Sequence, residues 1–82
     1  MRIDKFLKVS RLLKRRTLAQ EACNGGRIKV FDKTVKPSYN LKVGDVVEIA
    51  FASGSVKFEV LSLQEIVKKE QAESLYRIIV EN

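Results

Sequence analysis

The spacing of apolar residues changes partway along this 82-residue chain, and this change limits the fold more than any other feature of the sequence. Near the start, Ile3, Phe6 and Leu7 fall on one side of a helix in which successive residues are about 100° apart. From Arg27 onward apolar and polar residues alternate, which is the period of a strand with one buried face. Helical spacing followed by strand spacing is typical of an α+β domain. We therefore expect two short N-terminal helices packed on a small, mostly antiparallel sheet, and then a short C-terminal helix and strand.

Turn-forming residues divide the chain into these elements. A break after Ser10 separates the first helix from a second one, which we expect at about Arg15 to Cys23. The run Asn24–Gly26 then tolerates the left-handed backbone that commonly ends a helix. The expected strands are residues 28–30, 46–51, 56–60 and 76–80, with a short helix at residues 68–75.

The same spacing assigns side chains to the core or to solvent. Phe6, Phe51 and Phe58 occupy apolar positions of the predicted elements, so we expect all three rings in the core. The lone cysteine, Cys23, lies on the apolar side of the second helix and is expected to be a small core residue. The apolar side of that helix consists of Leu18, Ala19, Ala22 and Cys23, and the outer, polar side of the first helix consists of Asp4, Lys5 and Lys8.

The composition excludes several kinds of site. The chain has no histidine and a single cysteine, so we expect no imidazole catalysis, no histidine-containing metal site and no internal disulfide. The longest strictly apolar run, Ile49–Ala52, is far too short for a membrane span or a signal peptide, and we expect a cytoplasmic protein. The glutamates of residues 65–73 are expected to pair with Lys68 and Lys69 on a solvated helical face. Because so short a chain builds only a thin core and shows no catalytic constellation, we expect no enzyme and no cofactor.

Positive charge is concentrated at the N-terminal end. Residues 1–20 carry seven Lys and Arg against one Asp, whereas residues 51–82 carry four Lys and Arg against five Glu. This asymmetry favours a docking surface for a polyanion; the alternative is a basic face kept for solubility. Lys14, Arg15 and Arg16 crowd the predicted start of the second helix, where the helix dipole already places positive charge. The sequence therefore predicts a phosphate site there, with side chains that simply extend into water as the alternative.

Five short blocks of sequence carry more specific information. In chain order they are Met1–Leu7, Lys14–Ala19, Gly26–Val30, Lys36–Ser38 and Gly44–Asp45. Together, and in this order, they resemble the S4 RNA-binding domain, and the resemblance covers about residues 1–60. It implies the S4-type (αL) fold, in which two helices and the loop after them lie on structured RNA. We expect residues 1–62 to form the S4 RNA-binding domain and residues 63–82 to form a helix–strand extension of the same domain.

The small size of the chain and its Gln71–Tyr76 segment are similar to the stand-alone S4 proteins of bacterial ribosome-associated quality control. That resemblance implies a protein that binds the large ribosomal subunit, contacts 23S rRNA and stabilises peptidyl-tRNA in the P site during C-terminal tailing of stalled chains. The implied partners are large-subunit rRNA, peptidyl-tRNA and a tailing factor on the same subunit, with no membrane partner and a monomeric state. A general ribosome-associated S4 protein, or an RNA chaperone that binds structured rRNA, is the alternative.

The resemblance also points to particular residues. It places several N-terminal cations and the Gly26–Arg27 corner on RNA, and it gives Asp4 the task of orienting a neighbouring cation. Together with the other Lys and Arg residues concentrated at the N-terminal end, the candidate RNA-binding residues are Arg2, Asp4, Lys5, Lys8, Arg11, Lys14, Arg15, Arg16 and Arg27.

The chain departs from the family pattern at two places. Arg15 stands where many S4 domains have a Ser or Thr that caps the second helix, so we expect an uncapped helix start. Phe31–Asp32 stands where many have Asn-Gly, and we expect a loop of different shape. Phe31 and Tyr39 flank a loop, and base stacking by either is an alternative that the pattern does not favour.

Three other classes of protein fit less well. A DNA-binding helix-turn-helix would have only Thr17 and Gln20 as base readers on the second helix, and strands follow it. An RNA-modifying enzyme would need a catalytic domain, for which this chain has no room. An adaptor for anionic membranes or for proteins would bind its target without RNA.

Overall fold

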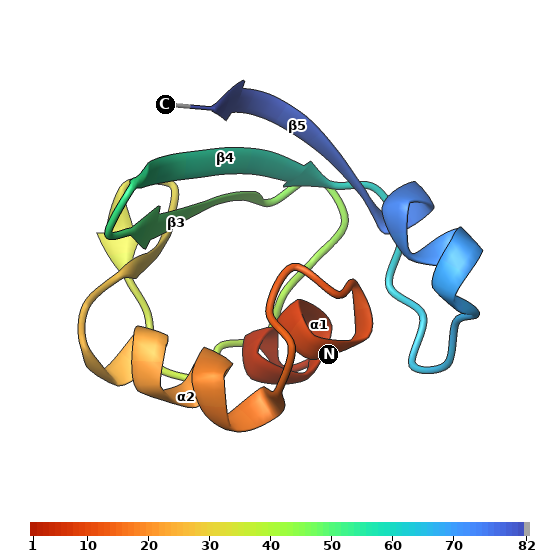
Figure 1. Cartoon of the computed structure of the whole chain (residues 1–82), viewed down its shortest axis with the longest axis horizontal. Helices are drawn as coiled ribbons and strands as arrows, with labels where there is room; N and C mark the ends of the chain where they lie inside the picture. The colour runs from red at the N-terminus through yellow and green to blue at the C-terminus, as the bar shows by residue number, and fades with distance from the viewer. Residues whose placement is uncertain (82) are drawn as a thin grey trace.

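Two layers of structure face each other in the computed structural model, which describes the backbone of residues 1–81 and the side chains of residues 1–80. The helices α1 (Ile3–Val9) and α2 (Arg16–Asn24) lie on one face of a five-stranded sheet (Figure 1). A 3-10 helix, η1 (Lys69–Leu75), lies beside the start of the last strand. The strands are β1 (Ile28–Val30), β2 (Lys33–Thr34), β3 (Val46–Phe51), β4 (Gly54–Val60) and β5 (Tyr76–Glu81), in the order β2-β1-β3-β4-β5 with every neighbouring pair antiparallel. The predicted α+β class is confirmed, and the predicted elements occur in the expected order, with β2 as an additional strand.

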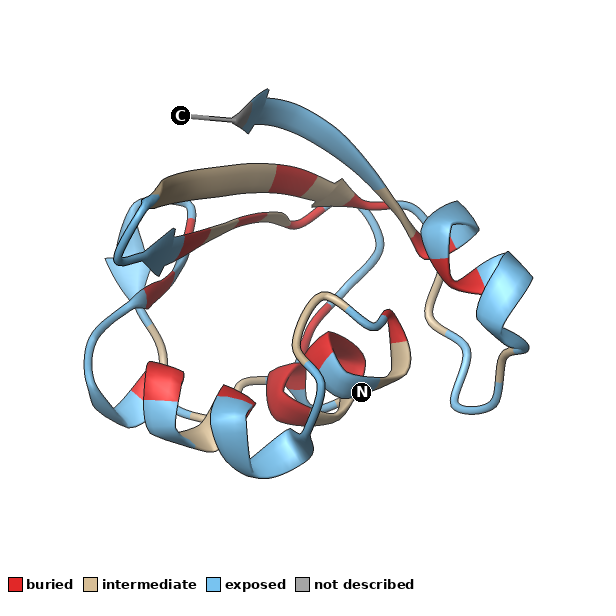
Figure 2. Ribbon diagram, viewed as in Figure 1, coloured by how far each residue is buried: buried red, intermediate tan, exposed pale blue. Residues whose placement is uncertain are grey.

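The core lies between the sheet and the two helices, where the buried segments of both layers face each other (Figure 2). Phe6 of α1 stacks on Phe58 of β4 with ring centroids 6.2 Å apart, and Tyr76 of β5 meets Phe58 edge-on at 5.6 Å. The β3–β4 register places Val47 directly opposite Phe58, so inward side chains of neighbouring strands meet under α1. Phe6 and Phe58 are fully buried, as predicted.

Two residues predicted for the core are instead partly exposed. Phe51 shares the inward face of β3 but is its last residue and pairs with Gly54 at the end of the hairpin; the ring is 40% exposed. Leu18 is 42% exposed because α2 buries the narrow stripe that runs from Ala19 to Cys23 at helical spacing. Leu18 lies at the edge of this stripe, about 40° of helical rotation from Ala22 and about 100° from Ala19.

The short hairpin between β1 and β2 was not predicted. Strand β2 has only two residues, both polar and exposed, so it carries no alternating pattern. Phe31 and Asp32 form the connection, and both have positive φ, of 48° and 66°. The chain therefore makes the tight turn that Asn-Gly would make, with residues that favour it less, so the expectation of a loop of different shape is wrong.

The last strand forms an edge of the sheet and contains a bulge. Lys57 pairs with Val80 and Phe58 pairs with Ile78, which leaves Ile79 without a partner on β4. Ile78, Ile79 and Val80 are all partly exposed on this edge. None of the helices in residues 1–81 is both long and apolar enough to cross a membrane.

Candidate nucleic-acid interface

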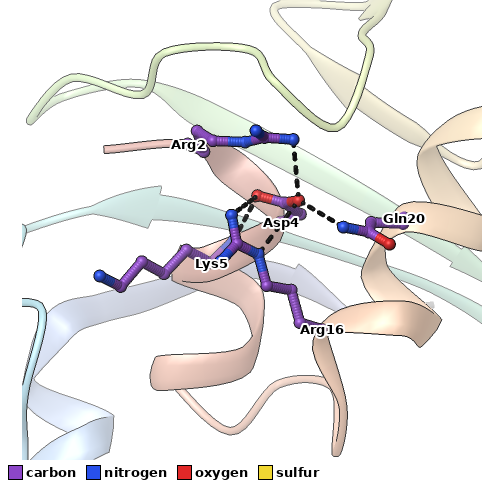
Figure 3. Close-up of polar contacts among 5 residues, drawn as sticks. All are labelled: Arg2, Asp4, Lys5, Arg16 and Gln20. Carbon is purple, nitrogen blue, oxygen red and sulfur yellow. Dashed lines mark hydrogen bonds and ion pairs between the residues drawn. The ribbon is translucent and has the colours of Figure 1, made fainter.

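A single buried carboxylate organises the basic N-terminal face. Asp4, in the first turn of α1, is fully buried, although its helix position predicted exposure. Its oxygens accept hydrogen bonds from the Lys5 backbone N–H at 2.7 Å and from Nε2 of Gln20 at 3.0 Å. Two guanidinium groups complete the shell: Arg2 Nη2 lies 3.3 Å from Asp4 and Arg16 Nε lies 3.2 Å from it. Figure 3 shows Arg2, Arg16 and Gln20 converging on Asp4 from different sides; we call these four residues the Asp4 cluster.

Asp4 is buried because the start of the chain is covered by a later segment. The backbone N–H groups of Ile3 and Asp4 donate to the carbonyls of Tyr39 and Pro37, at 2.8 and 3.3 Å. Arg2 forms an isolated bridge with Asn40 in the same segment. These bonds satisfy amides that the beginning of a helix otherwise leaves open. The start of α1 is therefore closed to anions, and Asp4 is enclosed between this segment and α2.

The hydrogen-bonded shell keeps Asp4 ionised. Burial alone raises the pKa of a carboxyl group, because it disfavours the charged form. The hydrogen bonds that Asp4 accepts from Gln20, Arg16 and the Lys5 backbone outweigh burial, so the pKa of Asp4 lies below its ordinary value. At neutral pH the carboxylate consequently holds both guanidinium groups in fixed positions.

The two arginines bind Asp4 with only part of their hydrogen-bonding capacity. The side chains of Arg2 and Arg16 are 51% and 42% exposed, and a guanidinium has five N–H donors. Two cations against one carboxylate also leave the cluster with net positive charge. The arrangement can therefore present pre-oriented donors to a phosphate oxygen, which suits the planar guanidinium fork. Asp4 was expected to orient one neighbouring cation, and in the structure it contacts two, Arg2 and Arg16.

Three further candidate RNA-binding cations lie together at the turn that follows α1. Lys8, Arg11 and Lys14 line a surface pocket of about 440 Å³, together with Glu65 and Ile66 from the loop before η1. Arg11 stands directly after the α1 C-cap with a φ of 62°, the left-handed position that glycine usually fills. The turn after α1 thus brings side chains from the helix and from the following loop into one basic pocket.

The side chain of Lys5 forms an ion pair within the chain. Its Nζ lies 3.0 Å from Oε1 of Glu65, and this hydrogen bond, followed by the charge of Lys5, lowers the pKa of Glu65. The predicted pairing of Glu65 with lysines of its own helix is wrong, because Glu65 lies in the loop before η1 and reaches back to α1. Lys5 therefore connects the C-terminal third of the chain to the basic face.

Arg15 and Arg27 stand at opposite ends of α2. Arg15 is the N-cap, in extended conformation and without a side-chain cap, as predicted from the missing Ser or Thr. It is exposed and makes no ion pair with any described residue. Arg27 is also exposed, but it follows the C-terminus of the nine-residue helix, about 14 Å from its start. The structure therefore separates Arg27 from the Asp4 cluster.

Gln20 also belongs to the Asp4 cluster. The sequence indicated it only as a base reader of a DNA-binding helix-turn-helix. It lies four residues after Arg16, so both side chains project from the same face of α2 toward Asp4. That spacing is the signal that could have assigned it. Within residues 1–81, no group of three or more Cys, Asp or Glu side chains is placed to hold a metal ion.

The fold and the basic face define a class of protein. The S4 domain model matches residues 1–47, the part that holds both helices and the Asp4 cluster, and the chain belongs to the S4 domain family. Over nearly its whole length it is similar to proteins named RQC P-site tRNA stabilizing factor. It is 51% identical to the one from Listeria monocytogenes, over 99% of this chain and 88% of that protein. It is 49% identical to the one from Streptococcus pneumoniae, over 99% of this chain and 92% of that protein.

Solved structures share the fold. The solution structure of the hypothetical protein HP1423 matches with a TM-score of 0.83 and 28% identity, covering 100% of both chains. The trimeric structure of heat shock protein 15 from Vibrio cholerae matches with a TM-score of 0.90, over 96% of this chain and 81% of that one. At 24% identity, the second likeness concerns the fold alone.

Proposed function

We propose that this chain is a non-catalytic RNA-binding translation factor that stabilises peptidyl-tRNA in the P site of the large ribosomal subunit. The names of the full-length relatives support the P-site and tRNA part of this proposal. Contact with 23S rRNA, action during C-terminal tailing beside a tailing factor, and a monomeric state in the cytoplasm complete the proposal. Residues 1–62 would supply the RNA-binding unit, and residues 63–82 would extend it through η1 and β5.

The observation that carries the proposal is the pair of half-exposed arginines held by one buried carboxylate. A flexible surface arginine loses conformational entropy when it binds, but Arg2 and Arg16 are already ordered by Asp4. Their free N–H groups, and the pocket lined by Lys8, Arg11 and Lys14 about one turn further along α1, supply positive charge on this N-terminal surface. Such a surface binds phosphates at fixed spacing, which is how structured RNA is commonly recognised. Bridging two RNAs in this way needs no covalent chemistry.

The test uses cations that have no structural task. Lys14→Gln with Arg15→Gln removes two exposed charges near the start of α2, while Lys68→Gln with Lys69→Gln removes two exposed charges at the start of η1 as a control with the same change of charge. We expect the first pair to weaken co-sedimentation with large subunits that carry peptidyl-tRNA. Each lost phosphate contact should also make the fall of log affinity with log salt less steep, by about 0.7 to 0.9 in slope.

Two outcomes would count against the proposal. If both double variants bind as the unmodified chain does, or lose affinity equally, the N-terminal face is not the interface. If subunits without peptidyl-tRNA, or free rRNA, bind equally well, the general ribosome-associated S4 protein or RNA chaperone describes the chain better.

A further inference from the structure

An aromatic ring stands exposed at the tip of the β1–β2 hairpin, outside the basic face described so far. Phe31 is 60% exposed and takes no part in the hydrophobic core. Its φ of 48° is in the left-handed region, which is unfavourable for residues with a Cβ and unusual for a bulky one. Phe31 thus has a backbone conformation that is unfavourable for an aromatic residue, and its ring gains no packing in the core that would offset this cost. Strain of this kind at the surface commonly marks a binding position.

Phe31 lines a groove that combines aromatic and cationic side chains. The groove has a volume of about 570 Å³, within the range of sites for small ligands. Tyr39 lines it together with Phe31 and the apolar side chains of Val30 and Val35, and Lys33 and Lys36 supply positive charge. No acidic residue is among the described residues that line it.

The groove adjoins the Asp4 cluster through the backbone. The Tyr39 carbonyl accepts from the Ile3 N–H at 2.8 Å, and the Tyr39 N–H donates to the Lys36 carbonyl at 2.9 Å. The next residue, Asn40, bridges to Arg2. The segment that holds Tyr39 and Lys36 in the groove is therefore the segment that covers the start of α1. A polyanion bound at Arg2 could continue into the groove.

We infer that this groove receives one unpaired nucleotide of the bound RNA, with its base stacked on Phe31 and its phosphate at Lys33 or Lys36. The inference rests on the proposed RNA-binding function. Every base has a π-face, so stacking is tolerant of sequence, and the lysines favour a nucleotide over a neutral side chain of a protein partner. Tyr39, fixed by its backbone bonds, forms the second aromatic side of the groove.

The test replaces the ring without disturbing the turn. Phe31→Asn removes the aromatic face but suits a positive φ, so we expect its melting temperature to equal or exceed that of the unmodified chain. We expect its affinity for large subunits carrying peptidyl-tRNA to fall about 5-fold to 150-fold, the effect of losing one base stack. Phe31→Tyr keeps a stacking ring and should bind within about twofold.

The salt dependence separates the groove from the phosphate contacts. Phe31→Asn should leave the slope of log affinity against log salt unchanged, while Lys33→Gln with Lys36→Gln should make it less steep by about 0.7 to 0.9 for the one phosphate. The inference is overturned if Phe31→Asn binds as tightly as the unmodified chain while Lys14→Gln with Arg15→Gln binds weakly, a result that leaves the proposed function standing. It is also overturned if Phe31→Tyr loses as much affinity as Phe31→Asn. If the unmodified chain does not bind these subunits, the proposed function fails, and this inference fails with it.

Discussion

Replacing Arg16 with alanine separates the two tasks that its side chain performs. The sequence alone predicts that this substitution weakens RNA binding and leaves the fold untouched. In the structure, however, Arg16 also donates to a fully buried carboxylate, so its removal leaves Asp4 with Arg2, Gln20 and one backbone amide. We therefore expect a loss of folding stability in the absence of any RNA.

The magnitude follows from the contacts that remain. A hydrogen bond to a charged group contributes about 1.5 to 3 kcal/mol, and breaking a fully buried ion pair costs about 3 to 5 kcal/mol. Arg16 is 42% exposed and three donors to Asp4 survive, so solvent screening places the loss near the lower limit, at about 1.5 to 2 kcal/mol. With a urea m-value of about 1 kcal/mol per molar for so small a domain, the unfolding midpoint should fall by about 1.5 to 2 M.

The assay is urea unfolding followed by circular dichroism at two pH values, with Arg15→Ala as the control. Arg15 is adjacent and exposed, and its removal should change the stability by less than about 0.5 kcal/mol. The pKa of Asp4 is lower in the folded state, so the stabilisation is present above the unfolded pKa and is lost as the pH falls through the folded pKa. The difference between Arg16→Ala and the unmodified chain should therefore be full at pH 7 and shrink below about pH 4. Equal stability at pH 7, or a difference that persists in acid, would refute this account of the Asp4 cluster.

Three other predictions concern the core, the cysteine and one turn. Phe6→Ala should cost about 3 to 5 kcal/mol in urea unfolding because the ring is fully buried against Phe58, and Phe51→Ala should cost less than about half as much; similar costs would contradict the core assignment. Burial, and then the charge of Asp4, raise the pKa of Cys23 to about 11, so the native chain should react with a thiol reagent at pH 8 far more slowly than the unfolded chain. Equal rates would show that the thiol is accessible. Gly44→Ala should lower the unfolding free energy by about 1 to 2 kcal/mol, since φ is 95° there and no heavy atom beyond the adjacent residues lies within 4 Å of the added methyl group; unchanged stability would show that the turn can rearrange.

Periodicity predicted the fold well wherever an element is long enough to repeat. The alternating residues of β3 and β4 and the helical spacing of α1 placed Phe6 and Phe58 correctly in the core. The same rule failed for Phe51, because alternation assigns a face of the sheet but not the distance along the strand that the helices cover. It also missed β2, whose two residues are too few to alternate.

The sequence predicted the positive charge of the candidate site but not the buried contacts that hold its side chains in place. The sequence indicated a basic N-terminal region, yet helix position placed Asp4 in solvent, and only the tertiary fold encloses it under the segment around Pro37. Gln20 joins Asp4 from α2; its spacing of four residues from Arg16 places those two side chains on one helix face, but no spacing along the chain relates Gln20 to Asp4. For Phe31, the sequence showed that the turn departs from the usual Asn-Gly. It could not show the groove beside the ring, because that groove forms only when β1 and β2 pair.

The bulge at Ile79 has a consequence for how this protein behaves at high concentration. An edge strand with three aliphatic side chains is a template on which further copies could add and grow into aggregates. The bulge leaves one residue of β5 without a partner and bends the strand locally, which makes its free edge a less regular template for an approaching strand. Deleting Ile79 would straighten that edge, and purified material would then precipitate on concentration even though the basic face is unchanged.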